Sequence, residues 1–129
     1  MAYTTTAINT SATIVAPAAA KLEACAGKAV KFDDNGKVVL ANKAGEVVMG
    51  VVVLATASVI EAGEDVDIQI KEIGKAVAGA AIKAGAELAV NANGALVTAT
   101  EGQFVVATAL EAATAAGHII NVQITKYQK

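Results

Sequence analysis

The fold is decided by the stretch Gly27-Lys-Ala-Val-Lys-Phe-Asp-Asp-Asn-Gly-Lys-Val-Val39, which recurs without a gap as Gly85-Ala-Glu-Leu-Ala-Val-Asn-Ala-Asn-Gly-Ala-Leu-Val97. Apolar positions coincide in the two copies, so that Val30 matches Leu88 and Phe32 matches Val90. An internal repeat of this length indicates a duplicated structural unit.

A second match follows in the same order and supports the duplication. Val66-Asp-Ile-Gln-Ile70 corresponds to Ile120-Asn-Val-Gln-Ile124, each shortly after a glycine. We therefore predict an internal repeat at about residues 27–70 and 85–124. The spacing between the matched segments differs, so the intervening loops are expected to differ in length.

Each copy has the alternating pattern of a β-hairpin. Val30 and Phe32 alternate with Lys31 before Asn35-Gly36, and Asn93-Gly94 repeats the turn in the second copy. Asn-Gly between alternating segments is the strongest short hairpin signal, because a two-residue turn needs positive φ at both positions. The run Val47 to Leu54 is apolar on both faces and is predicted to be a central strand.

The remainder of the body fits a mainly β fold. Two alanine-rich stretches, Ala18 to Ala26 and Thr108 to Ala116, are interpreted as loops that hold at most short helical turns. We expect residues 17–129 to form a single β domain built from two related hairpin units.

Residues 1–16 differ from the rest because they are threonine-rich and uncharged, and show no repeat partner. They are predicted to form a flexible, extended N-terminal arm that becomes ordered on a partner, and an ordinary frayed terminus is the alternative. The arm could add a strand to the edge of a neighbouring sheet. The candidate docking residues are Thr4, Thr5, Thr6, Ile8, Ile14 and Val15.

The composition excludes several classes of function. Of the 129 residues 55% are hydrophobic but only 3% are aromatic, so the core must be built from small side chains. Such a core buries little area per residue, which favours association with another copy of the chain. The cations are all lysine and the formal net charge is -2, which argues against nucleic-acid binding. No signal peptide or membrane-spanning segment is expected.

Catalytic, metal and cofactor sites are not indicated either. His118 is the only histidine and Cys25 the only cysteine, which leaves few ways to build a dyad or a metal site. Asp33-Asp34-Asn35-Gly36 lacks the spacing of a calcium loop and is better interpreted as a turn. The carboxylates of Glu61, Glu64 and Asp65 surround a glycine and are interpreted in the same way. We expect a protein that is not an enzyme and needs no cofactor.

Most of residues 12–126 resemble a family of tailed-phage capsid decoration, or cement, proteins, and in the earlier half this rests on Gly45-Glu-Val-Val-Met-Gly-Val51 and Gly63-Glu-Asp-Val-Asp-Ile68. In the later half it is carried by Ile82-Lys-Ala-Gly-Ala-Glu-Leu88, the turn at Asn93-Gly94, Val106-Ala-Thr-Ala-Leu-Glu-Ala-Ala113 and the final alternating strand. It departs at Ala107, where the family usually has glycine. The resemblance implies a small β-barrel or β-tulip-like sandwich, made in the host cytoplasm, that binds the outer surface of the phage head. Its implied partners are the major capsid protein and two further copies of itself, in a trimer that stabilises the mature shell.

Two other classes of function remain open at this point. A head fibre or other virion surface β module for receptor or carbohydrate attachment would need an exposed aromatic or polar recognition patch, and the chain has only four aromatic residues, 2 Tyr and 2 Phe. A small β-fold hydrolase would need a catalytic dyad.

Overall fold

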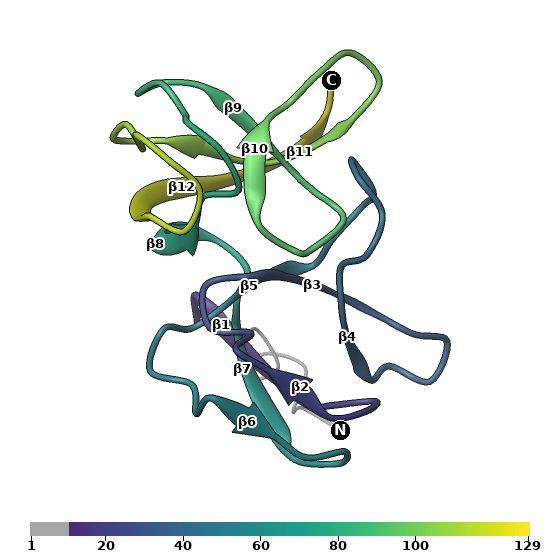
Figure 1. Cartoon of the computed structure of the whole chain (residues 1–129). Coiled ribbons are helices and arrows are strands. Elements are labelled where there is room, and N and C mark those ends of the chain that lie inside the picture. Colours follow the sequence, from purple (N-terminus) through teal and green to yellow (C-terminus); the bar gives the residue numbers. More distant parts are fainter. Residues whose placement is uncertain (1–10) are drawn as a thin grey trace.

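The computed structural model describes residues 11–129, and within that range every regular element is a β-strand (Figure 1). The mainly β fold predicted from the alternating pattern is therefore confirmed. The strands are β1 (Thr13–Pro17), β2 (Leu22–Glu23), β3 (Ala29–Phe32), β4 (Val38–Leu40), β5 (Gly50–Val52), β6 (Val59–Ile60), β7 (Asp65–Gln69), β8 (Glu72–Val77), β9 (Glu87–Val90), β10 (Leu96–Thr98), β11 (Phe104–Ala109) and β12 (Ile119–Gln128).

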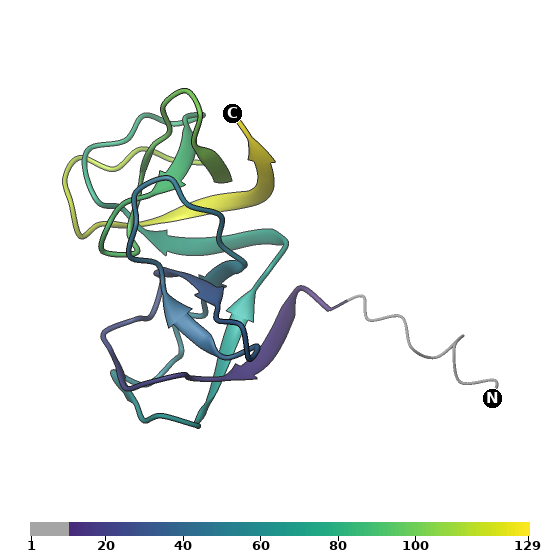
Figure 2. The same ribbon diagram turned by 90° about the vertical axis from the view of Figure 1, so that its right-hand side faces the viewer.

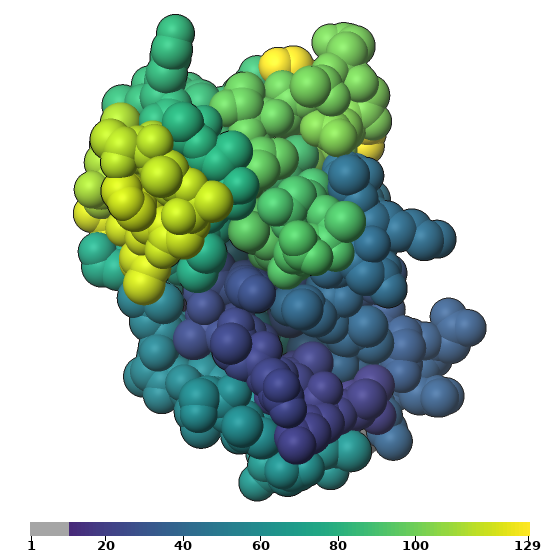
Figure 3. Space-filling view, viewed as in Figure 1, coloured from purple at the N-terminus to yellow at the C-terminus, as the bar shows by residue number. Residues whose placement is uncertain are grey.

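The strands form two five-stranded sheets of identical topology. One sheet has the order β1-β7-β5-β3-β4, and the other, taken from its opposite edge, has the order β8-β12-β11-β9-β10. A small two-stranded sheet, β2-β6, closes one end of the first half. We call residues 13–69 unit 1 and residues 72–128 unit 2. The units are stacked one on the other along the molecule (Figures 2 and 3).

The two sheets also pair equivalent residues in the same register. Val30 pairs with Gly50 in unit 1, and Leu88 pairs with Ala107 in unit 2. The run that was predicted to be a central strand contains β5, which lies in the middle of its sheet and is buried along its whole length.

The duplication extends further towards the N-terminus than the sequence indicated. Ala16 in β1 pairs with Val66, and Ala76 in β8 pairs with Ile120, so β8 is the counterpart of β1. The expected boundary of the arm at residue 16 is therefore corrected, because residues 13–16 already belong to the sheet. The sequence does not reveal this equivalence, because the two strands have different residues at almost every position. They match only in how their backbones pair with β7 and β12.

The hairpin turns are at the predicted positions but have a different conformation. Gly36 and Gly94 have φ angles of 74° and 82°, whereas the asparagine before each glycine does not have positive φ. The expectation of positive φ at both residues was therefore wrong. In each turn the glycine NH donates to the carbonyl three residues earlier, 3.1 Å to Asp33 and 3.2 Å to Asn91. The side chains of those two residues also accept backbone NH groups, which satisfies the turn locally.

The core of unit 2 also contains side chains from unit 1. Its buried apolar cluster, centred on Leu88, Val90 and Leu96, includes four unit 1 residues, which are Ala29, Ala41, Val48 and Val51. Backbone hydrogen bonds join the same region, from Ala29 NH to Gly94 O at 2.8 Å and from Val77 NH to Gly27 O at 2.9 Å. The units are thus joined by both apolar packing and main-chain pairing.

Unit 2 has an equivalent of the surface through which unit 1 contacts unit 2, and the C-terminal end of β12 covers it. Tyr127 pairs with Val105 of β11, and Gly102 NH donates to the carbonyl of Lys129 at 3.2 Å. A small buried cluster of Ala89, Ala99 and Val105 lies in this region. Ala99 and Gly102 correspond to Ala41 and Gly45, which lie at the contact between the units, called the joint below. The C-terminal end of β12 therefore covers in unit 2 the surface that, in unit 1, is covered by unit 2.

An ion pair in unit 1 holds the loop that leads to β5. Lys31 Nζ lies 2.7 Å from Glu46 Oε1, and the other carboxylate oxygen accepts the backbone NH groups of Asn42 and Lys43 at 2.8 Å and 2.9 Å. Burial alone would raise the pKa of Glu46, but these hydrogen bonds and the lysine charge outweigh it and hold the pKa below its usual range.

We predict that Gly94→Ala destabilises the protein more than Gly36→Ala. Both substitutions place a Cβ at positive φ, which costs about 1 kcal/mol. At Gly94 the added methyl group would also lie 2.9 Å from Leu40 Cδ1 at the joint, whereas nothing lies within 4 Å at Gly36. Urea unfolding should show an additional loss of about 1 kcal/mol for Gly94→Ala. Equal losses would show that the joint tolerates the added volume.

We further predict that stability falls on acidification through Glu46. A carboxyl whose pKa is lowered in the folded state stabilises the protein above its unfolded pKa of about 4.3 and loses that contribution as pH falls through the folded pKa. Glu46→Gln should therefore cost about 1–2 kcal/mol at pH 7 and flatten the decline of the unfolding free energy between about pH 5 and pH 3. The exposed Glu101→Gln serves as the control, and an unchanged pH profile in Glu46→Gln would contradict the assignment.

Candidate interaction surfaces

The two nucleophile and base candidates are far from forming a catalytic pair. Cys25 is completely buried in the core of unit 1, and burial raises the pKa of its thiol. His118 is exposed just before β12 in unit 2, where its Nδ1 lies 3.3 Å from Thr114 Oγ1. The structure places the two residues in different units.

Two of the acidic candidates, Asp33 and Glu64, are hydrogen-bonded to turns, whereas Asp65 lies exposed at the start of β7. Glu64 Oε1 accepts the NH of Glu61 at 2.6 Å, and Asp33 Oδ1 accepts two NH groups of the first hairpin turn. Within residues 11–129, no group of three or more His, Cys, Asp or Glu side chains is arranged to hold a metal ion. The carboxylates of Asp33 and Glu64 therefore stabilise backbone conformations.

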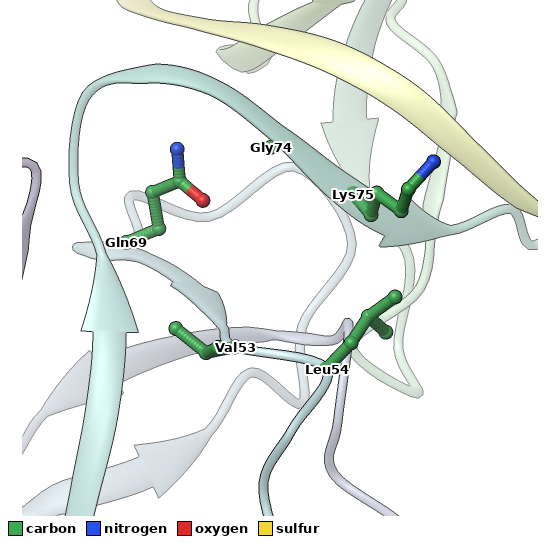
Figure 4. A pocket seen from close by; sticks show the side chains of 5 residues that line it. All are labelled: Val53, Leu54, Gln69, Gly74 and Lys75. Atoms are coloured by element: carbon green, nitrogen blue, oxygen red, sulfur yellow. The ribbon is translucent and has the colours of Figure 1, made fainter.

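A shallow pocket of about 230 Å³ lies where the two units meet (Figure 4). The amide of Gln69 donates to the carbonyls of Lys71 and Ile73 at 3.0 Å and 2.8 Å, which fixes the short link between the units. Sequence analysis could not identify this pocket, because its two sides come from different units. The pocket is lined by Val53, Leu54, Gln69, Gly74 and Lys75.

The outer face of unit 2, made by strands β8, β12 and the end of β11, exposes large apolar side chains. Ile73 is 61% exposed, Ile119 50% and Leu110 45%. Ile119 is paired with Val77 and Ile73 with Gln123, while Leu110 NH donates to Asn121 O. The apolar groups are therefore carried by β8, by β12 and by the residue that follows β11.

The outer face of unit 1, made by strands β1 and β7, has a different character. Asp65 and Asp67 project from β7, and Val15 on β1 is 57% exposed opposite Asp67. Of the candidate docking residues, Ile14 packs against the core of unit 1 and Val15 faces outward. The others, Thr4, Thr5, Thr6 and Ile8, lie outside the described residues.

The described residues contain no helix long and apolar enough to cross a membrane. No curated protein matches the chain. Among solved structures, the fold is similar to the N base of the head fibre of bacteriophage phi29, with a TM-score of 0.66 and 20% sequence identity. The similarity covers 91% of this chain and 96% of that chain, and at this identity it establishes the fold alone.

The sequence of the chain also matches a protein-family model. The match extends over residues 54–124, which includes the end of unit 1 and most of unit 2, and the family is described as phage cement protein. This region holds most of the glycines and alternating strands on which the resemblance to phage decoration proteins depended, and Gly45 to Val51 lie before it. The family match and the duplicated β architecture lead to one conclusion: this chain belongs to the phage cement protein family.

Proposed function

We propose that this protein binds the outer surface of a phage head and stabilises the mature capsid. The observation that carries the proposal is the family match, which covers residues 54–124. The surface supports it, because apolar side chains are exposed on two sheet faces while the candidate catalytic groups are buried, separated or engaged in turns. The major capsid protein is the partner, and the protein acts there without catalysis and without a cofactor.

The physical basis of cementing is linkage. A protein that binds an assembled shell, and does not bind its separated subunits, lowers the free energy of the assembled state by its binding free energy. Many copies on one shell add these contributions. A rigid, hydrogen-bonded body suits this role, since little conformational freedom is lost when it binds.

The protein works as a homo-oligomer, most simply a trimer. Within residues 11–129 the largest fully buried side chains are isoleucine, leucine and valine, with no aromatic ring among them. Side chains of this size contribute less hydrophobic stabilisation than aromatic ones, so further burial between copies is favourable. The number three comes from the resemblance to the decoration proteins.

The segment before β1 docks against the capsid. Its uncharged sequence suits strand addition to the edge of a capsid sheet, since no charge has to be desolvated. Because β1 already pairs with β7 from Thr13 onward, Thr4, Thr5, Thr6 and Ile8 form the docking part.

A role as a head-fibre base is a second candidate. The similarity in fold to the N base of the phi29 head fibre favours it. In that role the chain would carry a further receptor-binding or carbohydrate-binding part on the virion surface. The two candidates share attachment to the head and differ in whether attachment strengthens the shell.

We predict that saturating empty expanded heads with the protein raises their disassembly temperature. Heads are mixed with increasing protein, sedimented to measure bound copies, and heated while light scattering follows disassembly. The temperature should rise with occupancy and level off at saturation. Saturable binding without any rise would favour the head-fibre role, and no binding would contradict both.

We also predict that deleting residues 2–10 weakens attachment and leaves the body folded. The deletion spares β1, so the melting temperature should stay within about 2 °C of the full chain, while the dissociation constant for heads increases at least about tenfold. Deleting residues 2–15 is the comparison, because it removes most of β1 and should lower the melting temperature as well. Unchanged affinity after the shorter deletion would show that the segment has no docking role.

A further inference from the structure

The outer faces of the two units differ in chemistry although they occupy equivalent places in the fold. Within the matching ladders, Asp65 of β7 corresponds to Ile119 of β12, and Asp67 corresponds to Asn121. Asp65, Asp67 and Ile119 are all solvent-exposed. Equivalent backbone positions therefore carry a carboxylate in one unit and a large apolar group in the other.

The outer face of unit 2 combines this apolar surface with the cation of Lys75, and the carboxylate of Glu111, which accepts the NH of Asn121 at 2.8 Å, lies at the edge of this face. Lys75 lies on β8 between Ile73 and Val77, and its Nζ is 2.8 Å from Asn121 Oδ1. Its side chain also forms one side of the pocket between the units, next to Leu54. The cation is thus held at a defined position within apolar surroundings.

The outer face of unit 1 has complementary chemistry. Two carboxylates, on Asp65 and Asp67, lie two residues apart on β7 and point to the same side. Val15 lies directly opposite Asp67 on the edge strand β1. A negative pair beside an exposed apolar side chain matches a positive charge beside exposed isoleucines.

We propose that the outer face of unit 2 of one copy packs against the outer face of unit 1 of a second copy. Lys75 then lies opposite Asp67, and Ile73 and Ile119 cover Val15. This inference rests on the proposed self-association and specifies its contact. Because the two faces are different surfaces, the contact is head-to-tail, and each copy engages one neighbour through each unit.

Charge complementarity favours a second copy as the occupant of this face. Burying the exposed isoleucines brings Lys75 into the interface, and a buried cation needs a carboxylate partner. The chain itself provides that partner on an equivalent sheet surface. Two twisted sheets packed face to face can interdigitate such side chains at a separation of about 10 Å. Head-to-tail contacts of this kind close into a ring when the rotation between copies permits it, which is compatible with a trimer.

A charge exchange tests the contact directly. In sedimentation equilibrium of the full chain, Lys75→Glu and Asp67→Lys should each weaken self-association at least about tenfold, because each places like charges opposite one another. The double variant restores opposite charges with reversed polarity. It should associate within about threefold of the original protein, a recovery that independent surface effects would not produce.

Two further variants control for unfolding and for general surface effects. Ile119→Asp places in unit 2 the residue that unit 1 has at the equivalent position, and it should abolish association while the melting temperature is retained. Val47→Asp changes an apolar side chain that is more exposed but lies outside both faces, and it should leave association unchanged.

The outcomes separate this contact from the proposed function. Association that is insensitive to Lys75→Glu and to Ile119→Asp overturns the contact and leaves self-association intact. A monomer at all concentrations, which also binds heads as isolated single copies, overturns the contact and self-association while head binding stands. If the unmodified protein does not bind heads, the proposed function is overturned, whatever the association data show.

Discussion

The burial of unit 1 side chains within the core of unit 2 is the interaction on which the rest of the structure depends. Ala29, Ala41, Val48 and Val51 are buried in the same apolar cluster as the core residues of unit 2. Their small size allows the backbones to approach, so that Ala29 NH and Gly94 O can form a hydrogen bond. Alanine and glycine at the joint therefore bury little apolar area, but they allow close main-chain contact. This joint also determines how the outer faces of unit 1 and unit 2 are positioned relative to each other.

Because the joint involves different surfaces of the two units, the units are equivalent in fold but not in environment. Gly36 is exposed at the end of its hairpin, whereas the matching Gly94 is buried against the first unit. The exposed surface of Val47 likewise corresponds to Phe104, which is half-buried in the joint. Environments of this kind allow duplicated sequences to diverge, and the contrast between Asp65 and Ile119 is an example on the free faces.

The main features of the fold could be predicted from the sequence where the pattern is local. The hairpin signals at Asn35-Gly36 and Asn93-Gly94, and the apolar run that includes β5, indicated strands that the structure contains. The pairing of β1 with β7 was not predictable, because it joins distant segments with no shared motif. The turn conformation was missed because the roles of Asp33 and Asn91 as side-chain acceptors depend on geometry. The outer faces were missed for a similar reason, since exposure is set by the neighbours of a strand.

The position of Cys25 has a practical consequence for following the motions of this protein. It is the only thiol of the chain and lies fully buried in the core of unit 1, apart from the joint cluster. Reagents in solution can reach its sulfur only when that unit opens. The rate of thiol modification in the native state therefore reports the opening of one half of the molecule, without any introduced label. Measured on free protein and on bound particles, the same rate would show how strongly attachment restrains the half that carries the N-terminal segment.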